Sequence, residues 1–122
     1  MTLEYLHLTE DDAGVSHFNV GQIAMRKGDF APPAPPMMLS DYEPSRALVF
    51  LTLPAGWVGD QHPSPARQVA FCLAGRMRIE AGDGEVREIG PGGIWRMEDV
   101  AGAGHISSVL GHEAVQLAIV QI

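Results

Sequence analysis

The sequence predicts a single all-β domain of the sandwich or barrel class. Fourteen glycines and nine prolines interrupt the chain so often that no helix-period pattern is sustained. Short β-rich runs recur between these turn signals, at a spacing typical of sandwiches and barrels. The chain has 122 residues, 46% of them hydrophobic, which is enough for one domain with one packed core and too few residues for two.

Seven strands are expected between residue 47 and the C-terminal end of the sequence. They cover residues 47–53, 68–73, 76–81, 85–89, 93–97, 105–110 and 114–122. Asp83 and Gly84 separate two alternating segments and predict a tight hairpin there. In the run 76–81 apolar and charged side chains alternate, so this strand is expected to bury one face.

The second of these strands is expected to be buried on both faces. Val69, Phe71 and Leu73 are apolar on one face, and Ala70 and Cys72 on the other. In so small a domain the outer face can be covered only by the N-terminal segment or by another subunit. Because C2 dimers are the commonest assembly, the sequence predicts a homodimer.

Residues 29–38, "DFAPPAPPMM", form a proline-rich segment. Four prolines favour an extended, polyproline-like backbone and exclude a helix. The segment is expected to be an ordered arm lying on the barrel surface. The alternative is a recognition motif for the groove of another protein.

Charge and cysteine content exclude several partners. The net charge is −7 and the eight basic residues are scattered, which argues against nucleic acid as a partner. No run approaches ~20 apolar residues, and the acidic start lacks signal-peptide features, so neither a membrane span nor export is expected. Cys72 is the single cysteine, which excludes an internal disulfide and indicates a reducing compartment, the cytoplasm.

Two stretches carry candidate site residues. In "GWVGDQHPSPARQ" (56–68), His62, Ser64 and Gln68 share the parity that would aim them to one side of a strand. The prolines between them favour an edge or loop that feeds the strand at Gln68. His105 follows a flexible Gly-Ala-Gly turn and opens another β-rich run, so His62 and His105 could converge only through the fold.

The spacing of the first stretch resembles the first motif of the cupin superfamily. That motif runs from glycine through five residues to histidine, one residue to a second histidine, three or four to glutamate, and six to glycine. Here Gly56, His62, Ser64, Gln68 and Gly75 fit every interval. Ser64 stands where the second histidine would be, and Gln68 stands where the glutamate would be.

The second motif is represented more loosely. "GPGGIWRMEDVAGAGHIS" carries the glycine-rich turn and then His105 after a longer gap, and Val109 stands where asparagine would follow. Together the stretches resemble a group of small bacterial single-domain cupins. The resemblance covers residues 46–122 and implies a conserved cupin-type jelly-roll barrel, on which an N-terminal arm and first strands, residues 1–45, would pack.

The resemblance implies that His62, Ser64, Gln68 and His105 line one pocket near a mouth of the barrel. Cupins usually hold a divalent metal with three imidazoles and a carboxylate. Here His62, Gln68 and His105 would be the ligands of an iron, zinc, manganese or nickel ion. Because all three ligands are neutral, the affinity for the metal ion should be weakened. Glu98 or Asp99 could supply the missing carboxylate, or both could lie in a solvated turn.

The sequence therefore predicts a small cupin barrel that binds a small organic ligand in its mouth. Trp57 and Trp95 are expected either to flank that ligand or to lie in the core. Whether the protein is an enzyme stays open. One alternative is a metal-dependent oxygenase or isomerase, and another is an isomerase or lyase in which His62 and His105 act as acid and base without metal.

Arg96 also has two interpretations. Facing the pocket, it would suit a carboxylate-bearing substrate, and facing outward it would form a surface ion pair. Cys72 is interpreted as a small core residue rather than a nucleophile.

Overall fold

The computed structural model describes residues 2–122, and its ordered elements are all β-strands. They are β1 (Thr2–Glu10), β2 (Ser16–Ala24), β3 (Arg26–Gly28), β4 (Met37–Leu39), β5 (Ala47–Leu53), β6 (Gln68–Ala74), β7 (Arg76–Glu80), β8 (Val86–Ile89), β9 (Ile94–Met97), β10 (Ile106–Leu110) and β11 (Val115–Gln121). This confirms the all-β prediction. Within the described residues there is no helix of the length and hydropathy that a membrane span requires.

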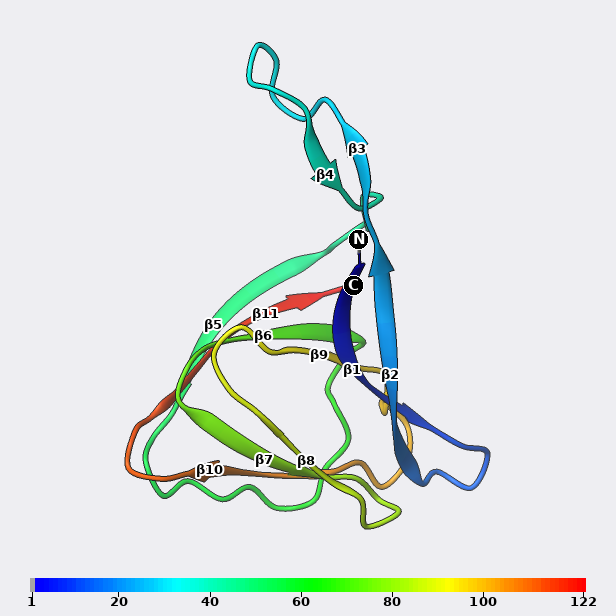
Figure 1. Cartoon of the computed structure of the whole chain (residues 1–122). Helices are drawn as coiled ribbons and strands as arrows, with labels where there is room; N and C mark the ends of the chain where they lie inside the picture. Colours follow the sequence, from blue (N-terminus) through cyan, green and yellow to red (C-terminus); the bar gives the residue numbers. More distant parts are fainter. Residues whose placement is uncertain (1) are drawn as a thin grey trace.

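The strands form two packed layers (Figure 1). One is a six-stranded sheet in the order β2-β1-β9-β6-β11-β5, and the other is a three-stranded sheet in the order β10-β7-β8. All pairs are antiparallel except β1 with β9. The arrangement is a jelly-roll sandwich, because the ladders of residues 2–122 do not join into one closed barrel.

All seven expected strands are present, with ends that differ by at most one residue. The β7–β8 hairpin turns at Asp83 and Gly84, where Gly84 has φ = +90° and its amide donates to the Ala81 carbonyl at 3.0 Å. Met77 and Ile79 on β7 are buried at 1% and 0% exposure. The alternating pattern in this part of the sequence therefore predicted the buried face correctly.

The N-terminal strands are part of the larger sheet. β1 pairs with β2 over its whole length and lies parallel to β9, with Leu8 opposite Met97. Leu8 is completely buried. Residues 2–24 therefore supply two strands that were not identified individually from the sequence.

The proline-rich segment does not lie along the surface. It forms the tip of the β3–β4 hairpin, which stands away from the sandwich (Figure 1). The tip turns where the Ala34 amide donates to the Ala31 carbonyl at 2.9 Å. The expectation of a surface arm was wrong, because Arg26 and Leu39 on either side of the prolines pair with each other, so the segment folds back on itself.

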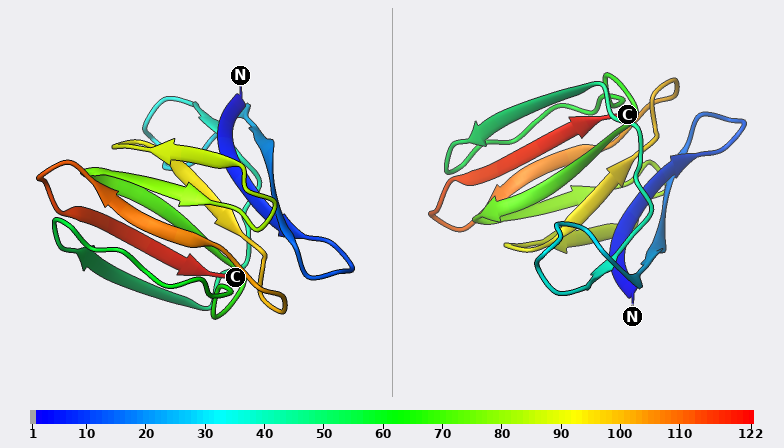
Figure 2. Two further views of the ribbon diagram at one scale, coloured as in Figure 1. Left: turned by 90° about the horizontal axis from the view of Figure 1, so that it is seen from below. Right: turned by 90° about the horizontal axis from the view of Figure 1, so that it is seen from above.

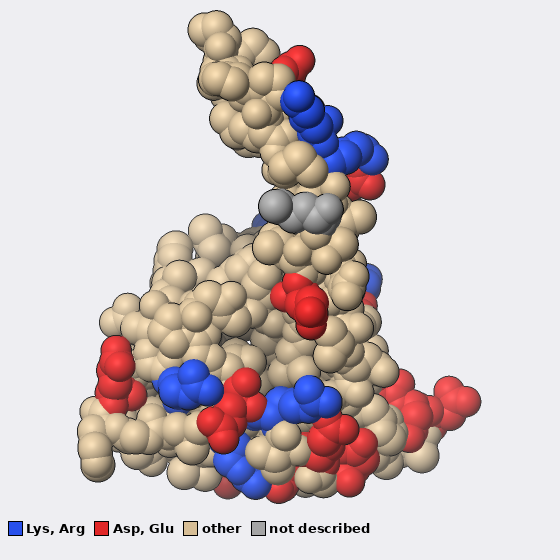
Figure 3. All heavy atoms as spheres, in the orientation of Figure 1, with Lys and Arg blue, Asp and Glu red and all other residues tan. Residues whose placement is uncertain are grey.

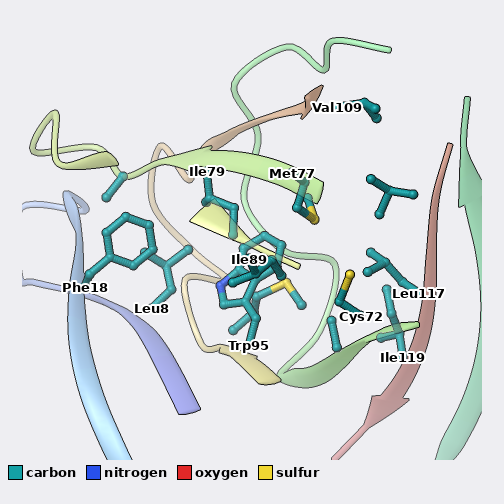
Figure 4. Packing of buried hydrophobic residues seen from close by; sticks show 14 residues of the cluster. Leu8, Phe18, Cys72, Met77, Ile79, Ile89, Trp95, Val109, Leu117 and Ile119 are labelled. Carbon is teal, nitrogen blue, oxygen red and sulfur yellow. The ribbon is translucent and has the colours of Figure 1, made fainter. Parts of the chain in front are cut away.

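The core lies between the two sheets (Figure 4). Trp95 sits between Leu8 and Phe18 on one side and Leu117 and Ile119 on the other. The larger residues of the core are Leu8, Phe18, Met77, Ile79, Ile89, Trp95, Met97, Val115, Leu117 and Ile119. Cys72 belongs to the same cluster, and its burial raises the pKa of the thiol, in agreement with a core role.

Replacing Leu8 by alanine tests whether the N-terminal strand is needed for stability. The change leaves a cavity next to Phe18 and should lower the free energy of unfolding by about 2–5 kcal/mol. Urea denaturation measures this loss. Val58→Ala is the control, since Val58 is 70% exposed and should change stability by less than about 0.5 kcal/mol. Equal effects of the two changes would contradict an integral role for β1.

Candidate functional site

The two motif histidines meet through their backbones. The His62 amide donates to the His105 carbonyl at 3.1 Å, and the His105 amide donates back at 3.0 Å, so the residues form an isolated antiparallel bridge. Their ring centroids are 5.1 Å apart, with the ring planes tilted by 50°. His62 is exposed at the surface, whereas His105 is only 3% exposed. The His62 imidazole therefore lies at the surface of the protein, and the His105 imidazole lies in its interior.

Gly104 makes this bridge sterically feasible. Its φ is +83°, and a Cβ built on it would lie 2.0 Å from the His62 carbonyl oxygen. Only glycine combines this backbone conformation with so close an approach. His62 itself lies outside the regular strands, as the flanking prolines predicted.

A fully buried carboxylate links the two motif stretches. Asp99 has 0% exposure; its Oδ1 accepts a hydrogen bond from Ser64 Oγ at 2.8 Å, and its Oδ2 lies 2.6 Å from His105 Nδ1. The Ser64 amide also donates to the Asp99 carbonyl at 3.0 Å. The interpretation of Asp99 as part of a solvated turn was therefore wrong. Trp95, Met97 and Asp99 are two residues apart and all point inward, a periodicity that could have identified Asp99.

These contacts determine which histidine nitrogens remain free to act. His105 Nδ1 pairs with a carboxylate, and His62 Nδ1 lies 2.7 Å from the Asp60 carbonyl oxygen. Both partners only accept hydrogen bonds, so each neutral ring donates from Nδ1 and keeps its lone pair on Nε2. Nε2 of each imidazole is thus the atom left to accept a hydrogen bond, take a proton or bind a metal.

All six residues that the sequence predicted to bind a ligand line one cavity. They are Trp57, His62, Ser64, Gln68, Trp95 and His105. The cavity holds about 300 Å³, and its remaining wall is mostly apolar, formed by β5, β7, β9 and β11 with residues such as Leu51, Met77 and Leu117. No Asp, Glu, Lys or Arg side chain of the described residues lines it. The binding roles assigned to these residues stay predictions.

Two residues that line the cavity have polar groups with weak hydrogen bonds or none. Gln68 is 6% exposed, and its amide has only long contacts of 3.5 Å, to Met97 Sδ and to Gln121 Nε2. Trp95 Nε1 is buried, and within the described residues it has no acceptor. The Trp95 ring stands edge-on to His105, with centroids 5.1 Å apart. Gln68 therefore has only one weak bond at each end of its amide, and a ligand could replace these bonds with stronger ones.

Arg96 and Glu98 point away from this cavity into an outer ion-pair cluster. Arg96 donates to Glu43 at 2.6 and 3.1 Å, and this hydrogen bonding lowers the pKa of Glu43. Burial alone would raise the pKa of Glu98, but hydrogen bonds from His7 and Arg67 outweigh burial and lower it. The surface ion pair predicted for Arg96 is present, so Arg96 is not positioned to bind a carboxylate-bearing substrate in the cavity.

The donor set does not fit a resident metal ion. His62 and His105 offer one neutral nitrogen each, and Gln68 offers an amide oxygen. Ser64 and both Asp99 oxygens are engaged with each other and with His105. Among residues 2–122, no group of three or more His, Cys, Asp or Glu side chains is arranged to hold a metal. Stable divalent sites usually include a third imidazole, a carboxylate or a thiolate, and none is free here.

Comparisons with known proteins support the fold. No protein-family model matches the chain, and no curated protein is significantly similar to it in sequence. The cupin domain of Schizosaccharomyces pombe Cnp3 is similar in structure, with a TM-score of 0.50 and 20% identity over 98% of this chain and 81% of that one. A Salmonella typhimurium structure described as ethanolamine utilization protein Q has a TM-score of 0.44 and 16% identity, over 99% and 96% of the two chains.

Substituting Gly104 tests how much the site depends on the His62–His105 bridge. Gly104→Ala should lower the free energy of unfolding by about 1–2 kcal/mol, because alanine is strained at a positive φ. The clash of the new Cβ with the His62 carbonyl, which separates the two histidines, should lower it by at least as much again. Gly56→Ala is a matched control, because Gly56 has φ = +82° and open space around its Cα. Equal losses in urea denaturation would show that the close approach to His62 has no energetic weight.

Proposed function

With the cupin fold as the premise, we propose that this protein binds a small, uncharged organic molecule in the cavity between the sheets. His62, Gln68 and His105 are the residues proposed to hold its polar groups. The observation that carries the proposal is the meeting of two imidazoles and a weakly hydrogen-bonded amide in one largely apolar cavity without Asp, Glu, Lys or Arg side chains. Such a cavity, apolar with a few convergent polar groups, is the usual form of a small-molecule site.

The polarity of the cavity supports an uncharged ligand. A carboxylate or ammonium group buried there would have no opposite charge to pair with, and isolated buried charges are strongly unfavourable. Neutral hydroxyl, carbonyl or amide groups can be satisfied by the imidazoles and by Gln68. At about 300 Å³ the cavity is at the small end of ligand pockets, so the ligand should be small as well.

Proton transfer to or from that ligand is the second candidate function. The Asp99–His105 contact favours it, because a buried carboxylate on Nδ1 orients the ring and stabilises the imidazolium that forms when Nε2 takes a proton. His62 would be the partner acid or base at the entrance. The metal-dependent alternative has less support, since the available donors do not suit a metal.

A reducing compartment such as the cytoplasm is part of the proposal. Cys72 is the single cysteine of the sequence and lies in the core. Its buried thiol has a raised pKa, so it has no evident role in redox chemistry. No stabilising disulfide is needed to account for the packing between the sheets.

Tryptophan fluorescence offers a direct test of binding, since both tryptophans of the chain line the cavity. Small neutral ketones, alcohols and amides should change the emission saturably, and the corresponding carboxylates should not. Gln68→Leu, which keeps the side-chain size but removes a hydrogen-bonding group, should weaken binding by about 2–10-fold. Gln22→Leu, on the exposed surface of β2, is the control. Preferential binding of carboxylates, or no effect of Gln68→Leu, would refute the proposal.

Deuterium exchange in D₂O tests proton transfer. If His105 acts as a base, the protein should accelerate exchange at the carbon next to the carbonyl of a neutral ketone such as cyclohexanone. Asp99→Asn should reduce this acceleration at least tenfold and change its pH profile, because the carboxylate no longer supports the imidazolium. Asp12→Asn, at an exposed position in the turn between β1 and β2, should leave the rate unchanged. Binding of the ketone without any exchange would limit the protein to a binding role.

A further inference from the structure

We infer that protonation of His17 regulates the candidate site through the turn between β1 and β2. The imidazolium of His17 connects Asp11, in this turn, to Asp83, in the β7–β8 hairpin. We call these three residues the clasp. When His17 loses its proton, the turn is held less firmly, and so is the loop that leads to His105. The consequence for a ligand rests on the proposed function, whereas the clasp itself does not depend on it.

Three connecting segments meet at one corner of the sandwich. They are residues 11–15 between β1 and β2, residues 81–85 between β7 and β8, and residues 98–105 between β9 and β10. All three lie on the lower right of Figure 1, and the left view of Figure 2 also shows them near one another. Contacts at this corner therefore connect the N-terminal strands to the loop that contains Asp99 and His105.

The end of β1 and the turn after it are hydrogen-bonded to the loop before β10. Both carboxylate oxygens of Glu10 accept hydrogen bonds, from the amides of Ala101 and Gly102 at 2.9 and 2.6 Å. The Ala103 amide donates to the Gly14 carbonyl at 3.0 Å. Three consecutive amides of the loop therefore have their partners in the N-terminal hairpin, and the position of the loop depends on the position of the turn.

Ser16, the first residue of β2, connects the three segments in the interior. It is completely buried. Its hydroxyl donates to the Gly104 carbonyl at 2.7 Å and accepts from the Gly82 amide at 2.7 Å. Gly104 precedes His105, and it lies so close to the His62 carbonyl that a Cβ on it would clash. A shift of Ser16 would therefore move the backbone that positions both histidines of the site.

His17 follows Ser16 and connects two of these segments at the surface. Its Nδ1 lies 2.9 Å from Asp83 Oδ2, and its Nε2 lies 2.8 Å from Asp11 Oδ2. Carboxylates only accept hydrogen bonds and a neutral imidazole has one N–H, so both bonds form together only when the ring is protonated. A neutral ring keeps one bond and turns a lone pair toward the other carboxylate. The clasp is therefore complete only when His17 is charged.

The three charges determine the pH range in which the clasp is complete. Hydrogen bonds to Asp11 and Asp83 raise the pKa of His17 above its ordinary value of 6.5. The His17 hydrogen bond lowers the pKa of Asp11, and the Glu85 amide together with His17 lowers that of Asp83, below the ordinary 3.8. The contribution of His17 is thus present below pH 6.5 and is lost as the pH rises through its raised pKa. The contribution of the carboxylates is present above pH 3.8 and is lost as the pH falls through their lowered pKa values.

Acidic side chains gather over the turn between β1 and β2, at the lower right of Figure 3, and they favour a cation on the clasp histidine. On β1, Thr9 lies opposite this histidine and is uncharged, while Glu10 is hydrogen-bonded to the loop before β10. Asp12 is exposed in the turn. On the β7–β8 hairpin, Glu85 pairs with Arg87. The histidine is therefore the group of the clasp that titrates nearest to neutral pH.

Proton NMR of the full chain tests the clasp itself. The ring protons of His17, identified by their loss in His17→Gln, should titrate with a midpoint above 6.5. Asp83→Asn should lower that midpoint, because one of the two partners loses its charge. Asp12→Asn removes the same charge from an exposed side chain of the turn and should lower the midpoint much less. A wild-type midpoint at or below 6.5, or equal shifts in the two variants, would overturn the clasp.

Amide hydrogen exchange tests whether the clasp holds the loop before β10. Well below the His17 midpoint, the amides of residues 101–103 should exchange about 2–5-fold faster in His17→Gln than in wild type, the size expected for exposed ion pairs. Well above the midpoint the two proteins should exchange at equal rates, because His17 is then neutral in the wild type as well. Asp12→Asn should match the wild type at both pH values. Equal exchange in wild type and His17→Gln below the midpoint would overturn the hold on the loop.

The effect on the site is tested with cyclohexanone, followed by tryptophan fluorescence. The Kd of His17→Gln divided by that of wild type should be about 2–5 below the His17 midpoint and about 1 above it, because a looser loop positions the site less precisely. This ratio cancels any pH effect that both proteins share, such as that of the site histidines. A ratio of about 1 at every pH would overturn the regulation of the site. If cyclohexanone does not bind to wild type, the proposed function is contradicted, and the exchange rates of residues 101–103 still decide whether the clasp holds the loop.

Discussion

The buried carboxylate of Asp99 is the interaction on which the site depends. It joins Ser64 from the first motif stretch to His105 from the second, so two parts of the chain about 40 residues apart converge on one side chain. Both carboxylate oxygens are satisfied, which makes complete burial tolerable. It also fixes which nitrogen of His105 is available, and thereby the chemistry that the cavity can support.

The alternation of side chains along β9 separates the residues of the site from the outer ion-pair cluster. On β9 and just beyond it, Trp95, Met97 and Asp99 point between the sheets, while Arg96 and Glu98 join the ion pairs outside. A strand sends successive side chains to opposite faces, so a single-residue shift in register would exchange these two sets. Among the described residues no arginine or lysine consequently lines the cavity, although Arg96 lies next to Trp95 in the sequence.

The same alternation gives β6 two different faces. Gln68, Ala70 and Cys72 point toward the cavity and the core, whereas Phe71 and Leu73 are exposed on the outer face. The outer face of this central strand is thus apolar as well, as the sequence of the strand predicted.

The seven strands from residue 47 onward, the Asp83–Gly84 hairpin and six of the residues that line the cavity could be predicted from the sequence. Local alternation, turn chemistry and motif spacing are properties of residues that lie close together in the chain. It did not resolve β1 and β2 individually, and it misjudged the proline-rich segment as a surface arm. The inward position of Asp99 depends on the register at the end of β9. The His62–His105 bridge depends on a contact between segments far apart in the chain. These features become visible only in the folded chain, because pairing and burial are set by residues that are distant in sequence.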